Sequence, residues 1–271
     1  MGRLFKAQTS EGYTIKVLAD LLQNNIKTAC LKVDKDAMKL SMFDSHRRVC
    51  FSFELHAEQF QIYKFKPPNS LFLGLNLGHF YKMIKSIKKK DSIVIFIDAE
   101  NPTDLGIKVV PKENNRVTTS YIKIQNIQNV DVQLPTGYGN PIIVPSNEYQ
   151  KMVKDMGAIS TSVRVVARRY SIQFSCDAGR VYSREVSFGE FDVDSDSDEE
   201  DDEIRYDDTF YTEQLSRIVK IAGLGNNIQV FVDKTQPLLF KTNVGTLGKL
   251  AVYVKSKTLL EREVAHMPSI N

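Results

Sequence analysis

The sequence is poor in cysteine and has no long hydrophobic run. Its cysteines, Cys30, Cys50 and Cys176, are odd in number and never closely spaced, which argues against a disulfide framework or a thiolate zinc site. We expect three small buried hydrophobic side chains instead. No apolar run approaches the roughly 20 residues that a membrane helix needs, and residues 1–6 lack the hydrophobic stretch of a secretion signal. We therefore expect an intracellular protein.

The motifs of common catalytic sites are missing as well. The four histidines are scattered, with no pair at helical spacing, so a zincin-type helix is excluded. Neither Gly-x-Ser-x-Gly nor a Walker motif occurs, and Gly245-Thr-Leu-Gly248-Lys249 has the wrong spacing for a phosphate loop. Outside one acidic segment, no carboxylates cluster that could hold two catalytic metals. We expect no enzymatic activity, no catalytic residue, no cofactor and no metal site.

Acidic residues are concentrated in one segment and scarce elsewhere. Residues 192–208 hold eleven acids and one base, Arg205. Of the 36 Lys and Arg and the 33 Asp and Glu, 35 and 22 lie outside this segment, which gives the remainder a net charge of +13. So dense a block of like charge predicts a solvated, mobile loop. A calcium loop from Asp192 to Glu203 is the weaker interpretation, because Ser197 stands where that loop needs glycine.

One amphipathic pattern recurs four times, at spacings of 66 to 69 residues. Apolar residues at i, i+3, i+4 and i+7 predict a helix with one buried face. The complete copies are Phe80, Met83, Ile84 and Ile87 within residues 77–89; Tyr149, Met152, Val153 and Met156; and Leu215, Ile218, Val219 and Ala222. A weaker first copy has Thr14 in the leading place, followed by Val17, Leu18 and Leu21. Ser146 and Thr212 are the expected caps of the last two helices.

Strand-type runs fill the intervals between these helices. They end at clusters of Asp, Gly, Asn and Pro, as hairpin connections require. The pattern predicts an α+β fold with two similar domains, each a duplicated unit of one helix and several antiparallel strands. The expected parts are an N-terminal domain, 1–124, a Pro- and Gly-containing linker, 125–140, and a C-terminal domain, 141–271. The expected strands cover 31–33, 39–42, 49–55, 92–98, 106–110, 117–124, 162–167, 171–176, 185–188, 227–232, 238–242 and 248–254.

The predicted solvent faces of the four helices are basic. Seven of the eight positions opposite the apolar stripes are Lys or Arg, and none is acidic. Ordinary helix faces interleave Glu with Lys, so this bias favours a continuous electropositive surface for a polyanion. Stacking aromatics and base-reading side chains are lacking there, which favours duplex nucleic acid held by its phosphates. The eight positions are Lys16 with Ala19, Lys82 with Lys85, Lys151 with Lys154, and Arg217 with Lys220; Lys88, Lys89 and Lys90 extend the second helix.

Over nearly its whole length the chain resembles the DNA sliding clamps of the proliferating cell nuclear antigen (PCNA) type. The order and spacing of several short motifs carry the resemblance. They are Leu40-Ser-Met-Phe43-Asp44-Ser45-His46, Leu75-Asn76-Leu77 with Lys82-Met-Ile-Lys85, Val144-Pro145-Ser146-Asn-Glu148-Tyr149 with Lys151-Met-Val-Lys154-Asp155, and Pro237-Leu238 followed by Gly248-Lys-Leu-Ala-Val-Tyr253. The acidic run at 192–208 resembles, in longer form, a short acidic loop of similar clamps.

The resemblance implies a subunit of a closed homotrimer around duplex DNA, with helices lining the hole and sheets outside. It implies a non-enzymatic processivity factor for DNA replication and repair that binds DNA without sequence specificity. The implied partners are a DNA polymerase, other clamp-binding proteins and a clamp loader. The implied location is the nucleus, or the site of viral DNA replication if the source is a large DNA virus. Similar clamps place basic residues facing the DNA at the positions of Lys16, Lys82, Lys85, Lys151, Lys154 and Lys220.

The resemblance also implies a pocket for short partner motifs that carry an aromatic and aliphatic plug. Its lining would be Phe43, Val132, Leu134, Pro237, Tyr253 and Val254. Two departures bear on partner choice. Phe43 replaces the family's usual Met, and Lys255-Ser256 stand where the family usually has Ala-Pro.

Two other functions remain open at this point. One is a monomeric DNA-binding scaffold of the same fold that forms no ring. The other is a metal-dependent enzyme that uses the Asp-rich segment at 192–208.

Overall fold

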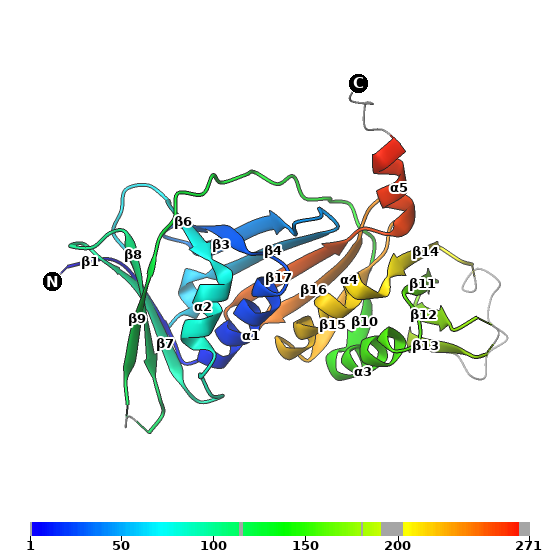
Figure 1. The fold of residues 1–271 in the computed structure, drawn as a ribbon, viewed down its shortest axis with the longest axis horizontal. Coiled ribbons are helices and arrows are strands. Elements are labelled where there is room, and N and C mark those ends of the chain that lie inside the picture. The colour runs from blue at the N-terminus through cyan, green and yellow to red at the C-terminus, as the bar shows by residue number, and fades with distance from the viewer. Residues whose placement is uncertain (1, 114–115, 180, 191–202, 266–271) are drawn as a thin grey trace. The chain divides into compact units, whose positions relative to one another are not determined.

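The computed structural model describes residues 2–113, 116–179, 181–190 and 203–265. In this part of the chain, a strand, a helix and at least three further strands follow one another four times (Figure 1). The predicted α+β fold of repeated helix-plus-antiparallel-strand modules is therefore confirmed. The chain also divides into two compact units. Unit 1 comprises Met1–Ser45, Phe51–Val132 and Asn243–Leu250, and unit 2 comprises His46–Cys50, Gln133–Thr242 and Ala251–Asn271.

The first two modules make up most of unit 1. The first contains β1 (Arg3–Thr9), α1 (Gly12–Gln23), β2 (Thr28–Val33), β3 (Ala37–Phe43), β4 (Val49–His56), the short 3₁₀-helix η1 (Ala57–Gln59) and β5 (Ile62–Phe65). The second contains β6 (Leu71–Asn76), α2 (Leu77–Ile84), β7 (Ser92–Asp98), β8 (Asp104–Val110) and β9 (Thr118–Lys123).

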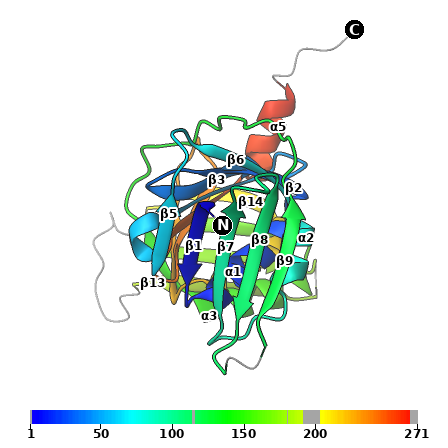
Figure 2. The same ribbon diagram turned by 90° about the vertical axis from the view of Figure 1, so that its left-hand side faces the viewer.

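The two modules of unit 1 exchange their first strands. β1 leaves its own module to pair with β7, and β6 leaves its own to pair with β2. One sheet therefore has the order β5-β1-β7-β8-β9, seen face-on in Figure 2, and four further strands follow the order β4-β3-β2-β6. Because each module completes the sheet of the other, the pair forms one folding unit.

The last two modules repeat this arrangement in unit 2. β10 pairs with β15 of the following module, and β14 pairs back with β11. The strand orders are β13-β12-β11-β14 and β10-β15-β16-β17. The third module contains β10 (Ile142–Pro145), α3 (Ser146–Gly157), β11 (Ser162–Ala167), β12 (Ser171–Asp177) and β13 (Ser183–Gly189). The fourth contains β14 (Tyr206–Tyr211), α4 (Thr212–Arg217), the 3₁₀-helix η2 (Val219–Gly223), β15 (Asn227–Phe231), β16 (Leu238–Val244) and β17 (Gly248–Val254).

The helices bury apolar stripes as predicted in α3, with corrections elsewhere. All four stripe residues of α3 are buried. In α2 Met83 is 36% exposed, whereas Ile84 and Ile87 are buried. In the fourth module Leu215 and Ile218 are buried, whereas Val219 and Ala222 are only half-buried, because the α-helix stops at Arg217 and a 3₁₀-helix follows.

The predicted stripe of the first helix is right for Leu18 and Leu21, which are buried, and wrong for Thr14 and Val17, which are half-buried. The buried face of α1 also contains Ile15, Ala19 and Leu22. Ala19 is therefore a core residue and not a solvent-facing one. Lys16 is the one basic residue of α1, so this helix lacks the basic pair of the other copies.

The predicted extension of the second helix through Lys88 to Lys90 is also wrong. α2 ends at Ile84, and Ile87 donates its backbone N–H to the Ile84 carbonyl in a turn. The Asp91 carboxylate then accepts the backbone N–H of Lys88 at 2.9 Å. This local side-chain bond competes with a helical one and closes the turn.

The two predicted helix caps, Ser146 and Thr212, are displaced by one residue. Both are the first helical residue, and the cap positions are held by Pro145 and Tyr211 in extended conformation. β10 and β14 run directly into the helices without a loop, so the last strand residue takes the cap position.

The acidic segment is not a loop throughout. Residues 206–208 belong to β14, where Asp207 pairs in register with Val166 of β11. Asp207 also receives two hydrogen bonds from the Arg164 guanidinium, at 2.8 and 2.5 Å. An ion pair across neighbouring strands removes the repulsion that argued against a strand here. Residues 192–202 lie outside the described residues, so the mobile-loop prediction and most of the calcium-loop alternative are not addressed by the structure.

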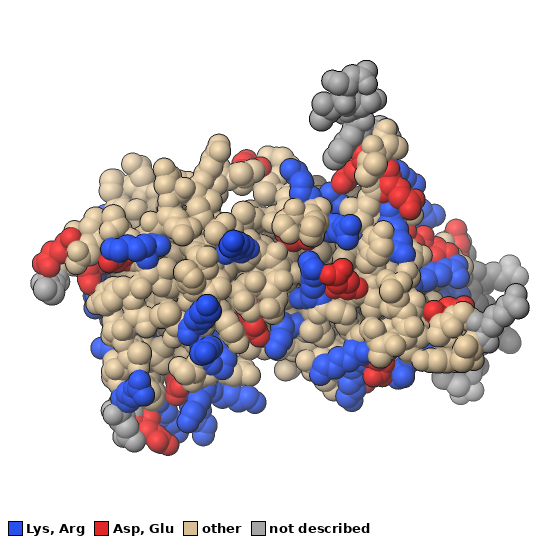
Figure 3. Space-filling view, in the orientation of Figure 1, with Lys and Arg blue, Asp and Glu red and all other residues tan. Residues whose placement is uncertain are grey.

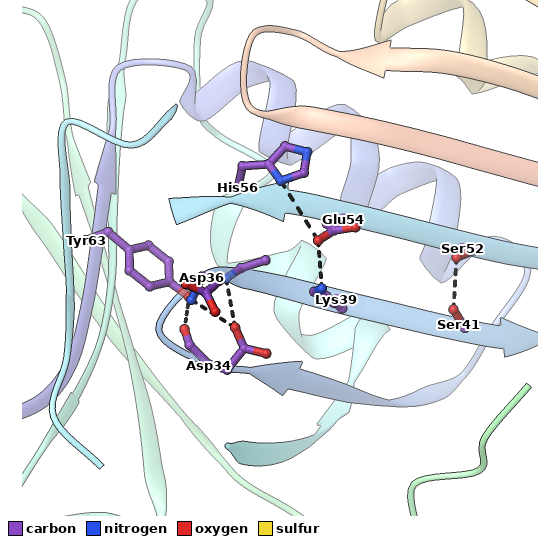
Figure 4. A network of polar contacts seen from close by, with 9 residues as sticks. Asp34, Asp36, Lys39, Ser41, Ser52, Glu54, His56 and Tyr63 are labelled. Carbon is purple, nitrogen blue, oxygen red and sulfur yellow. Dashed lines mark hydrogen bonds and ion pairs between the residues drawn. The ribbon is translucent and has the colours of Figure 1, made fainter. Parts of the chain in front are cut away.

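Polar cross-strand pairs cover the outward face of β3 and β4. Lys39 lies 2.7 Å from the Glu54 carboxylate, and the hydroxyls of Ser41 and Ser52 are 2.9 Å apart (Figure 4). The hydrogen bond to Glu54 raises the pKa of Lys39. The same strands bury Leu40 and Phe53 on their other side, so this sheet has one apolar and one polar face.

A C-terminal helix, α5 (Lys257–Ala265), was not predicted. Ser256 precedes it, and the Ser256 hydroxyl accepts the backbone N–H of Leu259 at 3.2 Å. Lys257 donates to the Ser162 hydroxyl, and Thr258 donates to Asp208. The first turn of α5 is thereby attached to β11 and β14 of unit 2. No helix within the described ranges is long and apolar enough to cross a membrane.

Candidate nucleic-acid interface and partner pocket

The basic residues of unit 1 lie on α2 and the turn that follows it. Lys82, Lys85 and Lys88 are exposed. Lys82 is in the last turn of α2, where positive charge is favoured by the helix dipole. Space-filling atoms of Lys and Arg gather over this region in Figure 3. The ammonium groups of these three lysines can therefore contact an anion while their aliphatic carbons stay in solvent.

Lys16 is held differently from the other basic residues of unit 1. It is half-buried, and its ammonium donates to the Ile87 carbonyl at 2.9 Å. The same ammonium lies 5.4 Å from the centre of the Tyr13 ring. Lys16 therefore joins α1 to the turn after α2, and its charge has a fixed position between the two helices.

The basic residues of unit 2 lie on α3, α4 and η2. Lys151, Lys154 and Lys220 are exposed, and Arg217 is half-buried. Two of these residues have acidic neighbours on the same helix. Lys151 lies 2.9 Å from Glu148, and Arg217 lies 2.5 Å from Glu213. Exposed pairs of this kind contribute about 0 to 1 kcal/mol, so an incoming phosphate can replace the carboxylate.

The basic face is therefore less uniform than the sequence indicated. Six of the predicted cations lie at exposed positions, namely Lys82, Lys85, Lys88, Lys151, Lys154 and Lys220. Lys16 and Arg217 are half-buried. Helix stripes alone do not reveal Glu148 and Glu213, because those acids flank the solvent-facing positions instead of occupying them.

Four of the six predicted pocket residues belong to unit 2. Tyr253 and Val254 end β17 and are buried, with Tyr253 only 7% exposed. Leu134 and Pro237 are half-buried. Burial raises the pKa of the Tyr253 hydroxyl, so it stays protonated and can donate a hydrogen bond. The other two predicted pocket residues, Phe43 at the end of β3 and Val132, are half-buried in unit 1.

Tyr138 joins this part of unit 2, although the sequence analysis missed it. Its hydroxyl donates to the Pro237 carbonyl at 2.7 Å, and its ring centre lies 6.5 Å from that of Tyr253. The preceding Gly137 has a φ of +85°, a conformation that glycine adopts without strain. Tyr138 is the one aromatic residue of the linker at 125–140 and stands between two glycines, which was the available signal.

The linker around Tyr138 contains little regular structure. Between Ile124 and Pro141 the described residues form no helix, and only Gln125 makes a β-bridge, to Gly74. Gln236 donates to the Thr136 carbonyl at 3.0 Å and fixes the second half of the linker to unit 2.

The described residues carry no group of three or more His, Cys, Asp or Glu side chains that could hold a metal ion. Cys30, Cys50 and Cys176 are free thiols and buried, which confirms that they act as small apolar side chains. Burial raises the pKa of Cys30 and of Cys176, so neither is an activated nucleophile.

Family models and individual relatives point to the same protein family. The family model described as "Proliferating cell nuclear antigen, N-terminal domain" matches residues 4–133, and the corresponding C-terminal domain model matches residues 135–257. A "Probable DNA polymerase sliding clamp 1" of Paramecium bursaria Chlorella virus 1 is 24% identical, over 91% of this chain and 94% of its own length.

Cellular relatives align over similar lengths. A "Proliferating cell nuclear antigen" of Chaetomium thermophilum is 23% identical, over 94% of this chain and 98% of its own length. The protein of the same name from Saccharomyces cerevisiae is 22% identical, over 88% and 92%. The two family models together cover nearly the whole chain, which therefore belongs to the proliferating cell nuclear antigen family of DNA sliding clamps.

Proposed function

We propose that three copies of this chain form a closed ring around duplex DNA and tether a DNA polymerase and other replication and repair proteins to it. The observation that carries the proposal is the exposed basic charge of the helices in both units. Lysines that contact phosphates bind any sequence and permit sliding. Topology then retains the protein on DNA, so the individual contacts can be weak.

Free sheet edges support assembly into a ring. Among the described strands, β9 ends the five-stranded sheet of unit 1, and β13 ends the four-stranded sheet of unit 2. Tyr121 on β9 is 60% exposed, and Tyr182, next to β13, is exposed as well. Such an edge is a template for pairing with another chain. Pairing of β9 with β13 of the next copy would be a heterologous contact, which can close into a ring.

The proposed partner site is the surface around Tyr253, Pro237 and Leu134. An aromatic and aliphatic plug of a partner would pack against these side chains, and the linker would lie beside it. We also propose that a clamp loader opens the ring. The place of action is the nucleus, or the site of viral DNA replication for a viral source; relatives of both kinds support this.

Solution mass tests the ring first. Light scattering should give about three times the 30.8 kDa of one chain. A mass of one chain would favour the monomeric scaffold instead.

Retention on DNA tests the topology. Protein loaded on a nicked circular plasmid should stay bound at moderate salt and should dissociate when one restriction cut linearises the plasmid. A scaffold that binds only by charge would be retained equally on both forms.

We propose that the chain has no catalytic activity of its own. The enzyme alternative predicts nuclease or phosphatase activity with magnesium that is lost when residues 194–203 are deleted. The clamp proposal predicts no such activity before or after the deletion.

A further inference from the structure

A large open groove lies within unit 2, with a volume of about 1020 Å³. Its walls are β10, the turn between β11 and β12, the end of β13 and the turn between β15 and β16. The basic helix faces and Tyr253 do not line it. The groove is therefore separate from the proposed DNA and partner sites, and it shares the end of β13 with the proposed ring contact.

The walls of the groove are held by backbone contacts. Glu190 donates its N–H to the Tyr170 carbonyl, and Arg205 donates its N–H to the Ala167 carbonyl at 2.9 Å. Gly189 has a φ of +114°, and a Cβ at this position would lie 2.1 Å from the Tyr170 carbonyl oxygen. Only glycine allows the end of β13 to approach the β11–β12 turn so closely.

The groove carries an excess of positive charge. Among the described residues that line it, four are cationic and two, Glu190 and Asp233, are acidic. Hydrogen bonds with Thr235 lower the pKa of Asp233. The cations come from three separate segments, Arg168 and Arg169 from the β11–β12 turn, Arg205 from the approach to β14 and Lys234 from the β15–β16 turn. Cations gathered from three segments favour an extended anionic partner over a single small anion.

The groove also offers apolar surface and a strand edge. Ile143 is 46% exposed and Tyr170 is 47% exposed, and both line the groove. β10, which contains Ile143, pairs only with β15 among the described strands. An extended peptide can add to such an edge through its backbone while its side chains enter neighbouring pockets.

We propose that this groove binds an extended acidic peptide segment of a partner protein, with at least one apolar residue seated on Ile143 and Tyr170. The carboxylates of the peptide meet the four cations at the rim. The site does not use the basic helix residues, and a failure of peptide binding would leave the ring proposal untouched.

Single-stranded nucleic acid fits the groove less well. The Arg169 guanidinium carbon lies 5.0 Å from the centre of the Tyr170 ring and covers one face of it. A base would have to displace this arginine in order to stack there. An aliphatic side chain needs only the exposed edge of the ring and Ile143.

A peptide with the sequence of one segment of this chain has the acidic and apolar residues that the proposal requires. Residues 190–203 hold Phe191 and Val193 among ten acids. A fluorescein-labelled peptide of this sequence would be titrated in trans against the full-length protein by fluorescence anisotropy. A peptide with Asn and Gln in place of its Asp and Glu is the charge control.

The key variant removes two rim cations, Arg205→Ser with Lys234→Ser. Its matched control removes two exposed lysines of unit 1, Lys66→Ser with Lys249→Ser. The dissociation constant of the acidic peptide should rise about fivefold or more in the groove variant, since two charge contacts are lost, and should stay within about twofold in the control. Ile143→Ser should weaken binding about threefold or more, because the apolar contact is lost.

The groove variant should also lose affinity in a background in which the acids at 192–202 are replaced by Asn and Gln, since the proposed contacts do not involve them. An equal loss in the groove variant and its control would overturn the proposal, as would no binding in either background. A single-stranded oligonucleotide that loses affinity in the groove variant while the peptide does not would also overturn it.

Discussion

The cationic side chains of the helices differ in how firmly they are held in one position. The ammonium of Lys16 is fixed by the Ile87 carbonyl, whereas Lys82 and Lys154 reach into solvent. A fixed charge gives orientation, and a flexible one follows a phosphate that moves past it. The combination fits the proposed role of these residues, which is to centre a duplex without binding one sequence.

Tyr253 and Leu134 are the residues at which the proposed partner site can be tested. Replacing either one with alanine should weaken the binding of a peptide with an aromatic and aliphatic plug by about 1 kcal/mol or more, because central aromatic contacts dominate such interfaces. Isothermal titration calorimetry gives the dissociation constants. Tyr253 is buried, so the melting temperature of each variant must be compared with that of the unchanged protein. Undiminished affinity in both folded variants would place the partner site elsewhere.

Asp207 links the stability of unit 2 to pH. The hydrogen bonds from Arg164 lower the pKa of the Asp207 carboxyl in the folded protein. The ionised form is therefore favoured by folding, and this stabilisation is complete above the unfolded pKa of about 4 and is lost as the pH falls through the folded value.

Asp207→Asn should thus lower the free energy of unfolding at pH 7, and the difference from the unchanged protein should shrink as the pH approaches 3. Urea titrations at several pH values measure it, with Asp177→Asn as the control aspartate at the end of β12. A difference that does not change with pH would exclude the ion pair as its source.

At the scale of secondary structure, the sequence predicted those elements whose pattern is local. The stripe of α3 is complete in four residues, and twelve strands appeared as apolar or alternating runs. The strand before each helix was missed in every module, as was β5. β10 ends on Pro145 and β14 begins with Tyr206-Asp207-Asp208, which obscures the strand pattern. β14 owes its state to pairing with another module, as Asp207 does with Arg164, and such long-range pairing leaves no local signal.

Individual site residues were predictable to a different degree. Lys82 and Lys154 followed from counting opposite an apolar stripe, since that geometry depends on the helix alone. Tyr138 could not be found in the same way. Its contact with Pro237 spans 99 residues in sequence and depends on a left-handed Gly137.

Helix α5 follows directly after Lys255-Ser256, where this sequence departs from the pattern of the family that it resembles. Family members usually have Ala-Pro where this sequence has Lys255-Ser256. Ser256 caps the helix through the N–H of Leu259, and the Lys255 ammonium lies 2.6 Å from the Glu263 carboxylate two turns further on. Serine is a preferred cap, and a serine that accepts this bond stabilises a helix by about 1 kcal/mol.

Ser256→Ala should therefore loosen α5 by about 1 kcal/mol, equivalent to roughly fivefold faster hydrogen exchange of its amides. Ser256→Gly should have a smaller effect, since glycine is tolerated at this position. Mass-spectrometric exchange of a peptide covering residues 257–265 gives the measurement. Equal protection in the unchanged protein and the alanine variant would show that contacts with β11 and β14 hold the helix without the cap.

For the whole molecule, duplication is the property with functional consequences. Each unit contains two modules that exchange first strands, so helices recur at regular intervals along the chain. Repetition of one helix position therefore repeats its charge. The paired strands hold the two modules of each unit together. Surface charges on the helices can therefore be altered without a change in the cores.

A variant in which four exposed lysines are replaced together by glutamate tests the DNA-facing surface. The four are Lys82, Lys85, Lys151 and Lys154. Polymerase synthesis on a primed circular template should lose its stimulation by the clamp, because four attractive phosphate contacts become repulsive in every subunit. The unfolding transition and the solution mass should not change, since all four side chains are exposed.

Reversal of Lys35, Lys66, Lys241 and Lys249 is the matched control, because these lysines are also exposed and carry the same total charge. Stimulation should persist in this control at physiological salt, where the Debye length of about 8 Å screens distant charges. Loss in both variants would attribute the effect to net charge. Unaltered stimulation in the first variant would instead remove α2 and α3 from the DNA-facing surface, and with them the main support for a duplex within the ring.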